Sequence, residues 1–253
     1  MSSGFAGFPP EAMTFLRGLK KNNTREWFQP RKEIYDEKVK APMIELVTAL
    51  MRRLADFAPD YVADPNKAIY RIYRDTRFSK DKTPYKTHIA AIFKHNHLEK
   101  HSGAGFYVSV SPGEIEVGGG VYMPMPEHLR SIRNYLAEHH EEFRRIVAAR
   151  DVRRLLGDVI GESATRVPKG FPADHPAEDL LRRKQFLLFQ TLEPSLATTP
   201  KLYREVVSRF QAMAPFLEFL NRPLFGMVTP AESPSLDPIA RRGARGDNTP
   251  GWR

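Results

Sequence analysis

The chain has 253 residues, no cysteine, and 39 lysines and arginines against 30 aspartates and glutamates, which gives a net charge of +9. The lack of cysteine excludes disulfide bonds, thiol nucleophiles and every metal site that uses thiolates. No stretch approaches the ~20 apolar residues that span a bilayer, and the first ten residues lack the basic and apolar segments of a secretory signal. We therefore expect a cytoplasmic protein without membrane association, whose basic surface attracts anions.

The first part of the chain has the pattern of a helical pair. A helix is expected to begin near Pro10, because proline suits a first helical turn and apolar residues follow at helical spacing. Asn23 and Glu26 form an Asn-x-x-Glu capping box, which predicts that a second helix begins at Thr24. Apolar residues at helical spacing then continue to about Phe57.

The middle of the chain changes to the period of two that is typical of β-strands. The alternation begins at Asn66 and predicts a first strand that runs into an ordered loop. A second strand is expected at residues 87–93, and a Ser-Pro-Gly turn separates strands at 106–110 and 114–117 in a hairpin. Together these segments predict a small, mostly antiparallel sheet over about residues 67–122.

Helical patterns return after the sheet. A helix is expected from Pro126 or Glu127, with two shorter helices after it, and a last helix is expected from Pro200. Residues 179–190 are ambiguous, because their first half suits a helix and their second half suits a strand.

The predicted fold is therefore an α+β domain over residues 8–225, in which N-terminal and C-terminal helices pack with the central sheet. Residues 1–7 are expected to be flexible. Residues 226–253 contain four prolines and four glycines and have no apolar period, so we expect a disordered tail.

The segment from Arg71 to Lys86 differs from the rest of the chain in its dense mixture of cations and aromatic residues. Residues 66–88 hold seven lysines and arginines against two aspartates, which is the clustering expected of an anion or nucleic-acid site. Arginine binds phosphate through two nitrogens at once, and aromatic rings can stack on a base. The candidate cations are Arg71, Arg74, Arg77, Lys80, Lys82 and Lys86.

A structural interpretation of the same segment stays open. In that interpretation the arginines pair with Asp75 and Asp81, and the lysines are solvated. A second lining for an anion site is offered by Arg130 and Arg133, which follow the glycines at 118–120. Those glycines are also consistent with close backbone packing at a strand end.

Histidines at 95, 97 and 101, with Glu99 between them, are more typical of a polar connection than of a metal site. We expect no metal and no cofactor. The sequence identifies no catalytic residue.

Several motifs occur together in one order along the chain. They are Phe8-Pro-Pro-Glu, Arg25-Glu-Trp-Phe, the Arg71–Lys86 segment, Gly118-Gly-Gly-Val-Tyr-Met-Pro and His175-Pro with the basic residues that follow it. On these motifs, over roughly residues 8–225, the chain resembles the domain of unknown function 2461 family. The resemblance implies no particular catalytic residue, cofactor or substrate.

Three functions stay open from the sequence. The first is the binding of an anionic ligand through the basic strand and loop. This ligand would be a phosphate-bearing molecule or a nucleic acid. The second is an enzyme that acts on a phosphorylated or carboxylated substrate, and the third is a structural or interaction protein in which the charges form a salt-bridge network. The sequence gives no indication of the oligomeric state.

Overall fold

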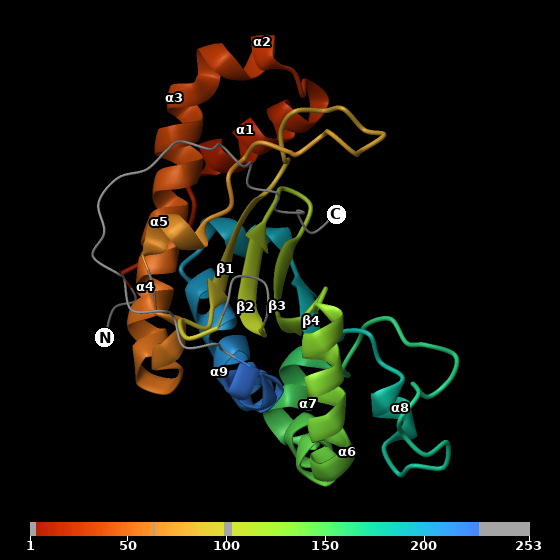
Figure 1. Cartoon of the computed structure of the whole chain (residues 1–253). Coiled ribbons are helices and arrows are strands. Elements are labelled where there is room, and N and C mark those ends of the chain that lie inside the picture. Colours follow the sequence, from red (N-terminus) through yellow and green to blue (C-terminus); the bar gives the residue numbers. More distant parts are fainter. Residues whose placement is uncertain (1–3, 63, 99–102, 228–253) are drawn as a thin grey trace, which may run out of the picture.

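A computed structural model of the chain describes residues 4–62, 64–98 and 103–227. It contains a four-stranded antiparallel sheet and many helices, so the predicted α+β class is confirmed (Figure 1). The strand order follows the sequence: β1 (Ile89–Lys94), β2 (Gly105–Val110), β3 (Ile115–Val121) and β4 (Phe186–Leu192).

The predicted hairpin is β2 and β3, which pair from Val110 and Ile115 at the turn to Gly105 and Gly120 at the far end. The Ser111 hydroxyl holds the turn, because it accepts hydrogen bonds from the N–H groups of residues 113 and 114. The ambiguous stretch 179–190 contains both alternatives. Its first residues lie in α8 (Glu178–Leu181), and its last residues lie in β4, which pairs with β3.

The strand predicted from Asn66 is wrong. Residues 65–68 form α5 (Pro65–Ala68), whose N-cap Asp64 accepts a hydrogen bond from the N–H of Asn66 at 2.9 Å. This cap and the proline in the first turn outweigh the alternating pattern. Between α5 and β1 the chain forms isolated bridges, Ile69 with Ala91 and Tyr73 with Tyr85, and no strand. The sheet therefore covers residues 89–121 and 186–192 rather than 67–122.

The N-terminal region is helical as predicted, with more breaks. It contains α1 (Pro10–Lys21), α2 (Arg25–Phe28), η1 (Gln29–Arg31), α3 (Lys32–Ile34), the π-helical η2 (Tyr35–Lys40), α4 (Ala41–Phe57) and η3 (Pro59–Tyr61). The predicted N-cap of the second helix is wrong by one residue. Thr24, rather than Asn23, is the N-cap of α2 and accepts a hydrogen bond from the N–H of Trp27. The Asn23 side chain instead bonds both main-chain groups of Tyr85, at 2.8 and 3.0 Å.

The C-terminal region contributes further helices besides α8 and β4. These are α6 (Pro126–Ala148), which departs from helical geometry at His139, α7 (Arg150–Leu156), η4 (Pro194–Thr198), α9 (Lys201–Asn221) and η5 (Arg222–Met227). No helix in the described ranges is long and apolar enough to cross a membrane.

One face of the sheet packs on α9, which lies behind the sheet in Figure 1. The ring of Phe210 lies 4.8 Å from that of Phe106 and 5.5 Å from that of Phe93, measured between centroids. A Cβ atom at Gly119 would lie 2.7 Å from the sulfur of Met213, so this glycine permits the close approach of α9. The other face of the sheet, which we call the outward face, is turned to the viewer in Figure 1.

The two chain ends are described only in part. Phe5 is 2% exposed and packs edge-on against Phe8, although it belongs to the N-terminal stretch expected to be flexible. Of the predicted C-terminal tail, residues 226 and 227 end η5, and residues 228–253 lie outside the described residues.

Candidate functional site

The basic loop, residues 71–86, is held against the N-terminal helices. The ring of Tyr85 stacks on that of Phe28 with a centroid distance of 4.2 Å and an interplanar angle of 21°, and Asn23 bonds the main chain of Tyr85. In Figure 1 the loop runs beside α1 and α2, beyond the end of the sheet.

Both aspartates of the basic loop are engaged by arginines of the same loop. Arg77 binds the Asp75 carboxylate through two nitrogens, at 2.7 and 3.0 Å, and Arg74 donates to Asp81 and to the Thr83 hydroxyl. The hydrogen bonds from Arg77 lower the pKa of Asp75 to about 2. The pKa of Asp81 is also lowered to about 2, first by the N–H of Thr83 and then by Arg74. These contacts have the geometry of a network that shapes the loop.

The other four candidate cations of the loop have different surroundings. Lys82 donates to the carbonyl of residue 76 at 2.8 Å. The Lys86 ammonium lies 4.7 Å from the centre of the Tyr70 ring, and burial lowers the pKa of Lys86. Arg71 and Lys80 are exposed and make no hydrogen bond or ion pair with another described residue.

The two arginines expected to line the site from across the sheet lie on α6, which Figure 1 shows at the other end of the sheet from the basic loop. Arg130 is exposed on α6, whereas Arg133 is half-buried and donates to the carbonyl of Arg183 at 2.8 Å. Arg133 therefore ties α6 to the segment that precedes β4. Burial lowers its pKa.

The glycine run is a site of close packing. Gly120 has a φ of 132°, and a Cβ atom there would lie 2.0 Å from the carbonyl oxygen of Phe186. At Gly118 a Cβ atom would meet the Phe189 ring at 2.5 Å. Because these contacts are with β4, the run allows β4 and its side chains to lie directly against β3.

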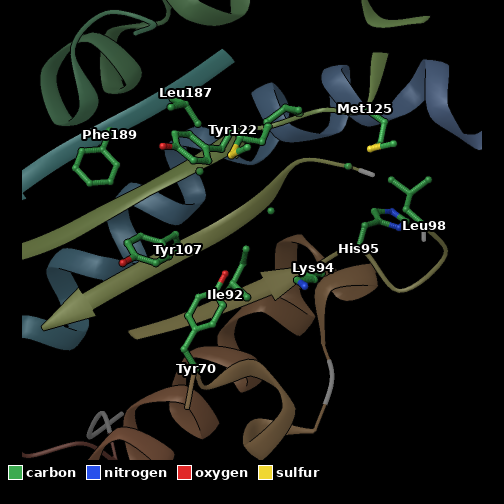
Figure 2. A pocket seen from close by; sticks show the side chains of 16 residues that line it. Tyr70, Ile92, Lys94, His95, Leu98, Tyr107, Tyr122, Met125, Leu187 and Phe189 are labelled. Carbon is green, nitrogen blue, oxygen red and sulfur yellow. The ribbon is translucent and has the colours of Figure 1, made fainter. Parts of the chain in front are cut away.

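A cavity of about 280 Å³ lies over the outward face of the sheet. Its side chains come from all four strands and from the segments next to them, and Figure 2 shows those of β1, β2 and β4 standing on the same side. The lining residues are Tyr70, Ile92, Lys94, His95, Leu98, Gly103, Gly105, Tyr107, Gly119, Gly120, Val121, Tyr122, Met123, Met125, Leu187 and Phe189.

The strand register explains why this face is hollow. One row across the sheet runs Lys94, Gly105, Gly120, Leu187, so that its two central positions have no side chain. The next row runs Ile92, Tyr107, Gly118, Phe189, and the rings of Tyr107 and Phe189 lie nearly parallel with a centroid distance of 6.5 Å. Residues opposite one another on neighbouring strands share a face. The two rows therefore make a glycine floor with an aromatic wall beside it.

The polar groups of the cavity are few. Among the described lining residues, Lys94 is the side chain with a fixed positive charge. His95 is 8% exposed, and burial lowers its pKa, so its ring is neutral at neutral pH. Its Nδ1 accepts from the N–H of His97 at 3.2 Å, which leaves the proton on Nε2. Burial raises the pKa of Tyr107 well above its ordinary value, so this hydroxyl stays protonated.

No group of three histidine, aspartate or glutamate side chains suited to a metal ion occurs among the described residues. Two members of the histidine-rich stretch considered from the sequence, residues 99 and 101, lie outside those ranges.

The cavity residues were not predicted from the sequence, although the sequence contains part of the signal for them. In β2 and β4, one position between the core residues is itself aromatic, Tyr107 in β2 and Phe189 in β4. A strand with apolar residues on both faces indicates that both faces are covered or bind something. The glycines opposite one another could be recognised only once the register was known.

Comparison with known proteins bears on the family alone. The search of curated proteins finds no match. A family model described as "Conserved hypothetical protein (DUF2461)" matches residues 11–219. The chain therefore belongs to the DUF2461 family, as the sequence motifs indicated.

Proposed function

We propose that this protein binds a small organic ligand, with a flat apolar body and one anionic group, on the outward face of its sheet. The observation that carries the proposal is the hollow over Gly105 and Gly120, walled by aromatic side chains. Ligand sites in proteins are concave, mostly apolar and furnished with a few polar groups, and have volumes of roughly 300–1,000 Å³. The cavity of about 280 Å³ lies just below the lower end of that range, so the ligand is expected to be small.

The chemistry of the lining supports this class of ligand. The rings of Tyr107 and Phe189 offer apolar surface to a flat group, and ring–ring contacts favour an aromatic body. The positive charge of Lys94 suits an anionic group on the ligand, because a charge-assisted hydrogen bond is stronger than a neutral one.

The proposed ligand is anionic, as expected from the composition, but its site lies on the sheet rather than at the basic loop. Arg74 and Arg77 are already paired with Asp81 and Asp75 inside the basic loop. An anion at these arginines would have to compete with those carboxylates. A cavity of this size suits a small molecule better than a nucleic acid.

The experiment uses anilinonaphthalene sulfonate, a flat aromatic anion whose fluorescence rises in apolar surroundings, and measures its displacement by naphthoate and by the neutral naphthamide. Ile92→Trp fills the cavity and is expected to weaken binding of both competitors at least tenfold. Lys94→Met is expected to weaken the binding of naphthoate about tenfold and to change the binding of naphthamide little. The reason is that a hydrogen bond to a charged group contributes about 1.5–3 kcal/mol.

Two matched variants serve as controls. Ile34→Trp makes the same change at an isoleucine that is 44% exposed and does not line the cavity, and Lys80→Met removes a lysine of the basic loop. Both are expected to bind as the unaltered protein does. If Ile92→Trp bound the competitors as tightly as the unaltered protein does, the proposal would be refuted. Loss of binding in Lys80→Met would indicate that the ligand binds at the basic loop instead.

A further inference from the structure

A second cavity, of about 300 Å³, lies on the other side of Tyr70, which lines both cavities. One wall comes from α3 and η2, with Lys32, Asp36 and Lys40. A second wall comes from α5, with Asn66, and from the start of the basic loop, with Arg71 and Tyr73. The two walls are far apart in the sequence, and the fold brings them together.

The charges of this cavity are unbalanced. Three cations, Lys32, Lys40 and Arg71, line it together with one carboxylate, that of Asp36. Asp36 forms an ion pair with Lys32, one helical turn away, and this hydrogen bond raises the pKa of Lys32. Lys40 and Arg71 are exposed and make no hydrogen bond or ion pair with any residue in the described ranges. Two positive charges in the cavity are therefore available to a ligand.

The local backbone is also unusual at this point. The six residues Tyr35–Lys40 form a π-helix between α3 and α4. Such wide turns are rare and occur frequently at functional sites. Tyr35 is buried, and its ring packs 5.6 Å from that of Phe28, so the π-helical turn is fixed to the helical core on one side. Its first residues, Tyr35 and Asp36, and its last, Lys40, line the cavity, together with Phe28.

We propose that this second cavity binds a small phosphate-bearing anion. The planar guanidinium of Arg71 suits two oxygens of one phosphate, and Lys40 adds a point charge from η2. The Asn66 amide supplies further hydrogen-bond donors. The site goes beyond the proposed function, since it shares only Tyr70 with the aromatic cavity on the sheet.

The test measures binding of inorganic pyrophosphate by titration calorimetry at low ionic strength. Arg71→Met and Lys40→Met are each expected to weaken binding at least tenfold, and the affinity of the unaltered protein is expected to fall as salt is raised. Both side chains are exposed, so the variants are expected to melt at the temperature of the unaltered protein.

Lys80→Met is the control, because Lys80 is an exposed lysine of the basic loop that lines neither cavity. Equal weakening by Lys80→Met would mean that pyrophosphate responds only to the overall charge, and this would overturn the proposal. The proposal would also be overturned if the unaltered protein did not bind pyrophosphate. The same holds if the protein bound a short oligonucleotide more tightly than pyrophosphate, with that binding weakened by Arg71→Met and Lys40→Met. Ile92→Trp should leave pyrophosphate binding unchanged, so failure of the aromatic site and failure of this site are distinguishable.

Discussion

His88, which directly precedes β1, should make the stability of the protein depend on pH between neutral and mildly acidic conditions. Burial, and then the charge of Lys86, lower the pKa of His88 from 6.5 to about 4 in the folded protein. The unfolded chain binds a proton at this position near pH 6.5, whereas the folded chain does so only near pH 4. The stabilisation from a neutral His88 is therefore present above pH 6.5 and is lost as the pH falls through 4.

The size of the effect follows from the two pKa values. The interval from 6.5 to about 4, at about 1.36 kcal/mol for each pH unit, corresponds to about 3 kcal/mol at pH 4. His95 adds a contribution of the same sign, because burial also lowers its pKa. Asp75 and Asp81 act at lower pH, since their pKa values are about 2 when folded and 3.8 when unfolded.

Urea denaturation at a series of pH values from 7 to about 4 measures this dependence. The free energy of unfolding of the unaltered protein should fall over this range, and His88→Gln should remove most of the fall. His97→Gln is the matched control, because the His97 side chain is 72% exposed, and its pH profile should follow that of the unaltered protein. Parallel profiles for His88→Gln and the unaltered protein would refute the assignment of the effect to His88.

Two further substitutions test the packing that shapes the sheet. Gly120→Ala should cost at least about 2 kcal/mol, because the φ of 132° and the carbonyl oxygen 2.0 Å from the new Cβ both oppose a side chain; Gly157→Ala, with a φ of 75° but nothing within 4 Å, should cost about 1 kcal/mol. Asn221→Leu should cost about 3 kcal/mol, because it removes three hydrogen bonds from a fully buried amide. Asn134→Leu, on the exposed face of α6, should change the free energy of unfolding by less than about 0.5 kcal/mol. Equal losses within either pair, measured by urea denaturation, would contradict these packing arguments.

The parts of the fold that could be predicted are those whose signals are local. The hairpin of β2 and β3 has β-forming residues on both sides of a Ser-Pro-Gly turn, and the structure follows this pattern. The strand expected from Asn66 failed because a second local signal, the cap at Asp64, acts on the same residues. Beyond it, Tyr85 packs against Phe28 of the N-terminal helices, which no nearby pattern indicates.

The candidate sites depend on contacts between distant segments, and this is why sequence patterns located them poorly. Arg71 was grouped with its neighbours in sequence, whereas the fold sets it in one cavity with Lys40. The hollow on the sheet exists because Gly105 and Gly120 are opposite one another, and that pairing is a property of the register. The charge excess of the basic loop was visible in the sequence, but the pairing of its arginines with its aspartates was only one of two open interpretations.

A methyl-NMR titration of isoleucine-labelled protein with naphthoate tests ligand binding on the outward face of the sheet most directly. The δ1 methyl group of Ile92, which lines the cavity, should shift and saturate with added naphthoate. The methyl group of Ile34, which lines neither cavity, should stay in place. Saturable binding of naphthoate that leaves the Ile92 methyl signal unmoved would contradict a ligand site on this face.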